Sequence, residues 1–138
     1  MASKPDGDRL DVTVLIVDDD EHFRAALADS LEEDGYGVLG ADSGEGALAL
    51  LDDASRGRMP KPDLMVLDLL MPGLSGVELL QRLRNSGCWE RLPVLVVTAL
   101  NDPMLPVRLD VPIAFKPDAQ VVLEAIRRQL TLNRAGPA

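Results

Sequence analysis

Polar side chains that could do chemistry stand directly after four apolar segments of the chain. Carboxylates brought together would repel one another and gain protons unless a cation neutralised them. All-oxygen ligation suits a hard divalent ion such as Mg²⁺ or Mn²⁺, and a carboxylate is also a nucleophile toward phosphorus. The residues in question are Asp18 and Asp19 after the first segment, Asp68 after the second, Thr98 after the third and Lys116 after the fourth.

Five segments have the composition of parallel strands, and four stretches between and after them have helical spacing. The strand segments are short and apolar without regular alternation, which is typical of strands buried on both faces. The helical stretches carry apolar residues on one stripe and a capping or acidic residue near the start. The predicted strands are Val12–Val17, Tyr36–Gly40, Leu64–Leu67, Val94–Val97 and Pro112–Phe115, and the predicted helices are Glu21–Asp34, Ser43–Asp53, Ser75–Asn85 and Asp118–Leu130.

Strands that alternate with helices predict an α/β fold with a doubly wound, five-stranded parallel sheet. The ligand site of such a sheet lies outside the carboxyl ends of its strands, where the polar residues above would meet. Phosphoryl transfer needs the three equatorial oxygens of the transferred group to be neutralised. A metal ion, the Lys116 ammonium, and the Thr98 hydroxyl with nearby backbone N–H groups would each serve one of these oxygens.

Length, charge and composition indicate the domain bounds, exclude some classes of ligand and bear on the location of the protein. The chain has 138 residues, and we place one domain at 12–131, between a flexible lead at 1–11 and a tail at 132–138. A net charge of −9 and an aromatic content of 3% argue against direct nucleic-acid binding. The N-terminus lacks the apolar stretch of a signal peptide, and the longest apolar runs are strand-sized. We therefore expect no membrane span and a cytoplasmic location.

Four blocks of the sequence resemble the signatures of bacterial response-regulator receiver domains, and they occur in the same order. The blocks are VLIVDDD, PDLMVLDLLMPGLSG, VLVVTA and FKP, and the resemblance covers roughly Val12 to Leu130. It implies a flavodoxin-like sheet with strand order 2-1-3-4-5, similar to the chemotaxis regulators of two-component signalling. It also implies Mg²⁺-dependent transfer of a phosphoryl group from a histidine kinase or a phosphotransfer protein. Such a module interacts with a partner protein or an output domain and is not a turnover enzyme.

The resemblance implies a role for each matching residue. Asp68 would be the phosphoacceptor and also a metal ligand, Asp19 a direct metal ligand and Asp18 a ligand that acts through water. The remaining matches are the Leu70 backbone carbonyl as third protein ligand, Thr98 as the switch hydroxyl, Ala99 as the small residue that leaves room for phosphate, Lys116 as the phosphate-binding lysine, Pro117 after a cis peptide bond, and Pro72 and Gly76 in the turn after the phosphoacceptor.

Two features depart from the family pattern. Ile113 stands where receivers usually carry tyrosine or phenylalanine, so the usual coupling of the Thr98 hydroxyl to an aromatic ring is in doubt. The segment from Asn101 to Val111 contains two prolines, and Pro112 follows it. Because proline removes an N–H and clashes inside a helix, we predict that the family's fourth helix, which would fall in this segment, is short, irregular or absent. The surface used for output, and whether the chain dimerises, are left open.

Two other functions are compatible with part of the pattern. Asp18 and Asp20 form a D-x-D after a strand, which resembles haloacid-dehalogenase-type phosphatases with Asp18 as nucleophile and Asp20 as acid/base. That family needs an acidic pair after the lysine, and only Asp118 lies close there. The simpler interpretation of Asp20 is a helix-start charge. The other alternative is a receiver-like interaction domain without a phosphate-driven switch. Ile113 and the prolines at 103, 106 and 112 favour it, and the complete set of acidic residues and lysine argues against it.

Overall fold

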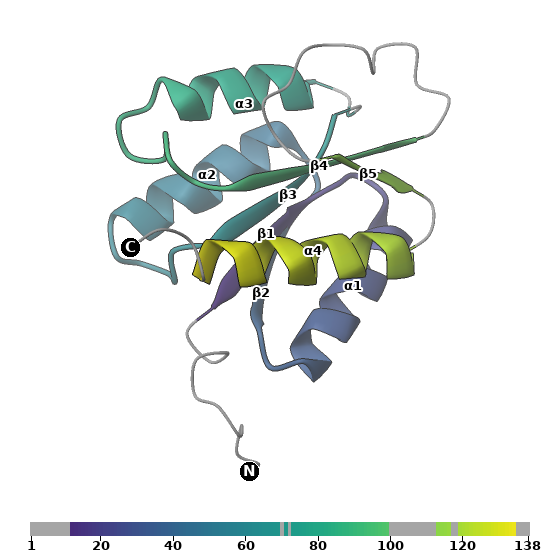
Figure 1. The fold of residues 1–138 in the computed structure, drawn as a ribbon. Coiled ribbons are helices and arrows are strands. Elements are labelled where there is room, and N and C mark those ends of the chain that lie inside the picture. The colour runs from purple at the N-terminus through teal and green to yellow at the C-terminus, as the bar shows by residue number, and fades with distance from the viewer. Residues whose placement is uncertain (1–11, 70, 72, 100–112, 117–118, 135–138) are drawn as a thin grey trace.

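Five parallel strands form one sheet in the order β2-β1-β3-β4-β5, and helices lie on both of its faces (Figure 1). The computed structural model describes residues 12–69, 71, 73–99, 113–116 and 119–134. The strands are β1 (Thr13–Val17), β2 (Gly37–Ala41), β3 (Leu64–Asp68), β4 (Val94–Ala99) and β5 (Ile113–Lys116), and the helices are α1 (Glu21–Glu33), α2 (Gly44–Ser55), α3 (Gly76–Arg84) and α4 (Ala119–Arg134).

Each central strand contributes its side chains to two separate apolar layers. In β1, Val14 and Ile16 pack with the buried residues of α1 and α4, whereas Leu15 and Val17 pack with those of α2 and α3. Alternate residues of a strand point to opposite faces, so an unbroken apolar run is needed to fill both layers. The α/β class and the parallel sheet predicted from such runs are confirmed.

The helix starts follow from the residues that cap them. The side chains of Asp20, Ser43 and Ser75 each accept a backbone N–H in the first turn of α1, α2 and α3. At α3 the carboxylate of Glu78 also accepts the Ser75 N–H, which completes a capping box. These caps satisfy N–H groups that have no partner within the helix, and they fix where the chain turns back over the sheet.

The last helix is longer than predicted. The apolar stripe ends at Leu130, and the tail was placed from residue 132, but α4 continues to Arg134. No glycine or proline occurs between Leu130 and Gly136, so the helix continues past Leu130, although Leu132 is 56% exposed and does not continue the buried stripe. The segment 101–111 lies between β4 and β5, where the family's fourth helix was expected to be short, irregular or absent. This segment is outside the described residues. None of the described helices is long and apolar enough to cross a membrane.

Candidate functional site

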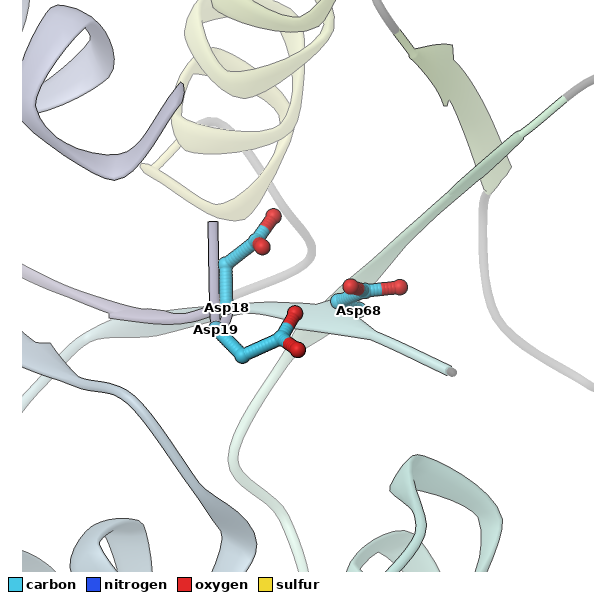
Figure 2. A group of neighbouring side chains, drawn as sticks. All are labelled: Asp18, Asp19 and Asp68. Atoms are coloured by element: carbon cyan, nitrogen blue, oxygen red, sulfur yellow. The ribbon is translucent and has the colours of Figure 1, made fainter. Parts of the chain in front are cut away.

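Three carboxylates meet at the carboxyl ends of β1 and β3. These strands pair in parallel with Val17 opposite Leu67, so the residues that follow, Asp18 and Asp68, lie side by side. Asp19 is the next residue along, and one carboxylate oxygen from each of the three aspartates lies within 4.8 Å of the others (Figure 2). The sheet thus brings together the acidic residues that the sequence placed at one edge.

The cluster combines buried and exposed carboxylates. Asp18 and Asp68 are only 2% and 5% exposed, whereas Asp19 is exposed. Burying like charges together is costly unless a cation compensates them. The donor set is all oxygen, which suits a hard divalent ion, and the exposed Asp19 leaves one side of the cluster open to solvent. The three residues therefore fit an Mg²⁺ or Mn²⁺ ion.

Hydrogen bonds hold Asp18 from three directions. Its backbone N–H donates to the Ala41 carbonyl of β2 at 3.0 Å, and its Oδ1 accepts the Asp20 N–H at 2.8 Å. Its own carbonyl accepts a hydrogen bond of 2.6 Å from Nη1 of Arg24 in α1. Arg24 was not among the site residues predicted from the sequence. The only available signal was an arginine one helical turn after the acidic run, and most such arginines are solvated.

Asp20 belongs to the helix rather than to the cluster. Its Oδ1 accepts the Phe23 N–H at 3.1 Å and caps α1. The interpretation of Asp20 as a helix-start residue is thereby confirmed. The phosphatase alternative would use Asp20 as acid/base, but the carboxylates that converge are those of Asp18, Asp19 and Asp68.

Close backbone contacts shape the turn that follows Asp68. Gly76 donates its N–H to the Leu69 carbonyl at 3.1 Å, and a Cβ on Gly76 would lie 2.5 Å from the Asp68 carbonyl oxygen. Only glycine fits at this distance, and Gly76 is one of the two residues that the resemblance assigned to this turn. A second tether comes from α2, where Glu45 accepts the Leu74 N–H at 3.2 Å. Leu70 and Pro72, the other residues assigned to this turn, lie outside the described residues.

The ends of β4 and β5 complete this edge of the sheet. Asp68 pairs with Val97, so Thr98 and Ala99 continue β4 just beyond the level of Asp68. Ala99 pairs in turn with Lys116, and Ile113 pairs with Val96 further back in the strand. The backbones of Thr98, Ala99 and Lys116 therefore lie at the edge that carries Asp68, and their roles toward phosphate stay predictions. Pro117 lies outside the described residues, so the predicted cis peptide bond stays a prediction.

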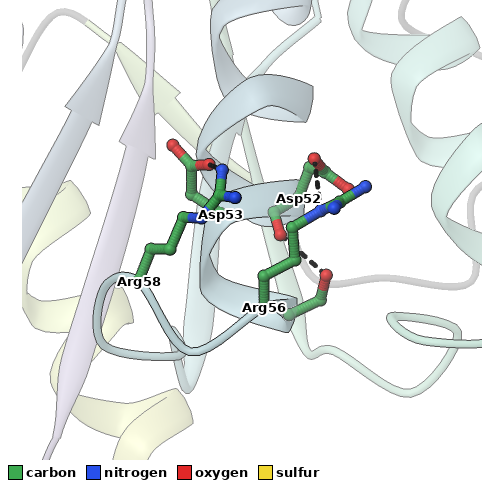
Figure 3. A network of polar contacts seen from close by, with 5 residues as sticks. Asp52, Asp53, Arg56 and Arg58 are labelled. Carbon is green, nitrogen blue, oxygen red and sulfur yellow. Dashed lines mark hydrogen bonds and ion pairs between the residues drawn. The ribbon is translucent and has the colours of Figure 1, made fainter.

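The basic loop after α2 has no part in this site. Arg56 pairs with Asp52 at 3.1 Å and Arg58 with Asp53 at 3.3 Å, all on the surface (Figure 3). Exposed pairs of this kind contribute roughly 0–1 kcal/mol. The solvated-loop interpretation of these arginines fits the structure.

Comparison with known sequences agrees with the fold and the acidic cluster. Residues 14–111 match the sequence pattern of the family described as "Response regulator receiver domain", and the chain belongs to this family. Receiver domains are signalling modules of two-component systems rather than conventional enzymes. This assignment agrees with the resemblance seen in the four sequence blocks and displaces the phosphatase alternative.

Named relatives match the receiver region only. The transcriptional regulatory protein AfsQ1 of Streptomyces coelicolor is 40% identical over 90 residues, covering 65% of this chain and 36% of AfsQ1. The phosphate regulon regulator PhoB of Pseudomonas aeruginosa is 39% identical over 90 residues, covering 65% of this chain and 37% of PhoB. The chain thus spans little more than a third of the length of these relatives.

Solved structures share the fold over most of the chain. A CheY-like receiver domain from Methanospirillum hungatei has a TM-score of 0.75 and 26% identity, covering 91% of this chain and 99% of that one. The response regulator TrrA of Thermotoga maritima, solved in complex with Mg²⁺ and BeF, has a TM-score of 0.67 and 26% identity, covering 86% and 98% respectively.

Proposed function

We propose that this chain accepts a phosphoryl group on Asp68 from a histidine kinase or a phosphotransfer protein, in the cytoplasm, with a divalent metal ion bound beside it. The observation that carries the proposal is the meeting of three carboxylates within 4.8 Å in a receiver domain. The related TrrA was solved with Mg²⁺ and BeF, which supports the same site here.

The acidic residues would bind the metal ion, and one of them would also receive the phosphoryl group. Asp19, the exposed member, would bind Mg²⁺ or Mn²⁺ directly, Asp18 would bind it through water, and the Leu70 carbonyl would be a further ligand. When bound, the metal ion neutralises the carboxylates and one oxygen of the phosphoryl group. Asp68, at the end of β3 and 5% exposed, would be a metal ligand as well as the nucleophile.

The reaction exchanges one bond to phosphorus for another. A carboxylate oxygen of Asp68 attacks the phosphorus of a phosphohistidine while the phosphorus–nitrogen bond breaks. The electron pair of that bond returns to the imidazole nitrogen, and Asp68 becomes an acyl phosphate. Water later attacks the phosphorus, which releases inorganic phosphate and restores the Asp68 carboxylate. No diffusible substrate is turned over.

Residues at the ends of β4 and β5 would bind the transferred group. We assign the ammonium of Lys116 and the hydroxyl of Thr98 to its remaining oxygens, and Ala99 to the space it needs. The pairing of Ala99 with Lys116 in the sheet supports this assignment, because it brings both strand ends to the edge that carries Asp68.

Removal of the metal ion provides the test of this proposal. With acetyl phosphate and Mg²⁺, we expect the intact mass to rise by one phosphoryl group. An excess of EDTA should reduce labelling to background, and added Mg²⁺ should restore it. Labelling that proceeds equally well in EDTA would contradict a metal-dependent acceptor.

A receiver-like interaction domain without a phosphate-driven switch is the second candidate, and Ile113 is the observation that favours it. Mg²⁺ with beryllofluoride, which mimics the phosphoryl group, separates the two. A responsive receiver should show NMR chemical-shift changes at the Thr98 and Ala99 amides, near the mimic, that spread into β5. Binding without changes beyond the acidic cluster would favour the second candidate.

The names and lengths of the relatives indicate the kind of output that the receiver controls. AfsQ1 and PhoB are named as transcriptional regulators and extend well beyond the matched region. We propose that the phosphorylated receiver acts on a protein partner or an attached output domain, and that this chain does not itself contact nucleic acid.

A further inference from the structure

The guanidinium of Arg24 lies against the backbone of the acidic cluster. Arg24 is in the first turn of α1, and its Nη1 donates a 2.6 Å hydrogen bond to the Asp18 carbonyl. That carbonyl belongs to the peptide unit that joins Asp18 to Asp19. A hydrogen bond with a charged donor is roughly twice as strong as a neutral one, so it restrains the plane of this peptide.

The Asp19 carboxylate depends on that peptide for its direction. Asp18 has its own restraint, because its Oδ1 accepts the Asp20 N–H at 2.8 Å. Asp19 is exposed, and within the part of the chain that the structure describes no group donates a hydrogen bond to its carboxylate. The backbone before Asp19 therefore sets the direction of its Cα–Cβ bond and so limits the positions that the carboxylate reaches.

The Arg24 side chain lies beside Gly40 of strand β2 on the way to its acceptor. Gly40 is exposed in β2, and a Cβ built on it would lie 3.4 Å from Cδ and 3.6 Å from Nε of Arg24. The stem of Arg24 thus passes over Gly40 at a distance where a side chain on that residue would touch it. The guanidinium thus comes from α1 and its acceptor from the loop after β1, and β2 lies beside the arginine side chain.

We propose that Arg24 is a positioning residue for the metal site, which holds the Asp18–Asp19 peptide so that the Asp19 carboxylate faces Asp68. This inference rests on the proposed function and deepens it. The charge of Arg24 alone would act in the opposite direction, because a guanidinium repels a divalent cation. Its removal weakens metal binding if positioning dominates and tightens metal binding if charge dominates.

Arg24→Met is the variant that separates these effects. Methionine keeps an unbranched stem and a high helix propensity, so we expect the fold to be retained, as thermal unfolding in EDTA will show. Titration calorimetry with Mg²⁺ should give a dissociation constant roughly 10- to 100-fold higher than that of the wild type, the usual effect of removing a residue that orients a ligand. Arg56→Met removes the same charge from an exposed loop and should leave the affinity unchanged.

A rate measurement distinguishes positioning from a general structural role. The Mg²⁺ concentration for half-maximal labelling by acetyl phosphate should rise by the same factor as the dissociation constant. The labelling rate at saturating Mg²⁺ should return close to the wild-type rate, because Asp68 is untouched. An unchanged or tighter Mg²⁺ affinity overturns the inference, and so does a folded variant whose rate stays low at saturating Mg²⁺. Wild-type protein that neither binds Mg²⁺ nor becomes labelled would instead refute the proposed function.

Discussion

Replacement of Asp68 with asparagine is expected to abolish phosphoryl labelling by acetyl phosphate. The amide nitrogen and oxygen of asparagine occupy the place of the carboxylate, but neither forms an acyl phosphate. Asp68 is buried beside Asp18 and Asp19, and a neutral side chain there reduces the repulsion within the cluster. The fold should therefore persist, which circular dichroism will check, while the intact mass stays that of the unmodified chain.

Asp42→Asn provides the matched control for this variant. Asp42 directly follows β2 at the same edge of the sheet, is exposed, and lies outside the cluster of three carboxylates. The substitution changes the net charge equally, yet labelling should stay at the wild-type level. Equal loss of labelling in both variants would show that the charge of the sheet edge matters rather than the Asp68 nucleophile.

Replacement of Gly76 with alanine is expected to cause the largest loss of stability. The added Cβ would lie 2.5 Å from the Asp68 carbonyl oxygen and 2.7 Å from the Leu69 Cα. Both atoms belong to the backbone and cannot rotate away, so β3 or α3 must shift. Forced overpacking of this kind costs about 3 kcal/mol of unfolding free energy, measured by urea denaturation. Phosphoryl labelling should fall as well, because the clash displaces the backbone of Asp68, the proposed phosphoacceptor.

Gly87→Ala separates this clash from the cost of losing a glycine. Gly87 has a φ of 80°, and nothing lies within 4 Å of the Cβ position. Alanine in the left-handed region costs about 1 kcal/mol, with no effect on labelling expected. A Gly76→Ala variant as stable as wild type, or less destabilised than Gly87→Ala, would mean that the turn after Asp68 yields easily.

The acidic cluster could be predicted because a simple rule of parallel sheets places it. Asp18 and Asp68 each end an apolar run, and neighbouring parallel strands bring their carboxyl ends to one edge. The starts of α2 and α3 were equally accessible, since Ser43 and Ser75 cap their helices through contacts with residues close in sequence. Local chemistry and one topological rule account for both successes.

Contacts between distant elements escaped prediction. The Glu45 carboxylate reaches the Leu74 N–H across 29 residues of sequence, and its geometry depends on how α2 lies against the turn after β3. The Arg24 hydrogen bond depends in the same way on the packing of α1 over β2. A glutamate or arginine in the first turn of a helix carries no mark of such a bond in its local sequence. The end of α4 was misplaced for a different reason, because the residues after Leu130 extend the helix without continuing its buried apolar stripe.

Identification of the modified residue tests the proposed function most directly. The wild-type chain is labelled with acetyl phosphate and Mg²⁺, reduced with borohydride to trap the acyl phosphate, digested, and analysed by peptide mass spectrometry. We predict that the reduced residue is Asp68 and that it is absent when EDTA is present during labelling. Modification at Asp18 or Asp19, or no modification at any aspartate, would contradict the assignment of Asp68 as the phosphoacceptor.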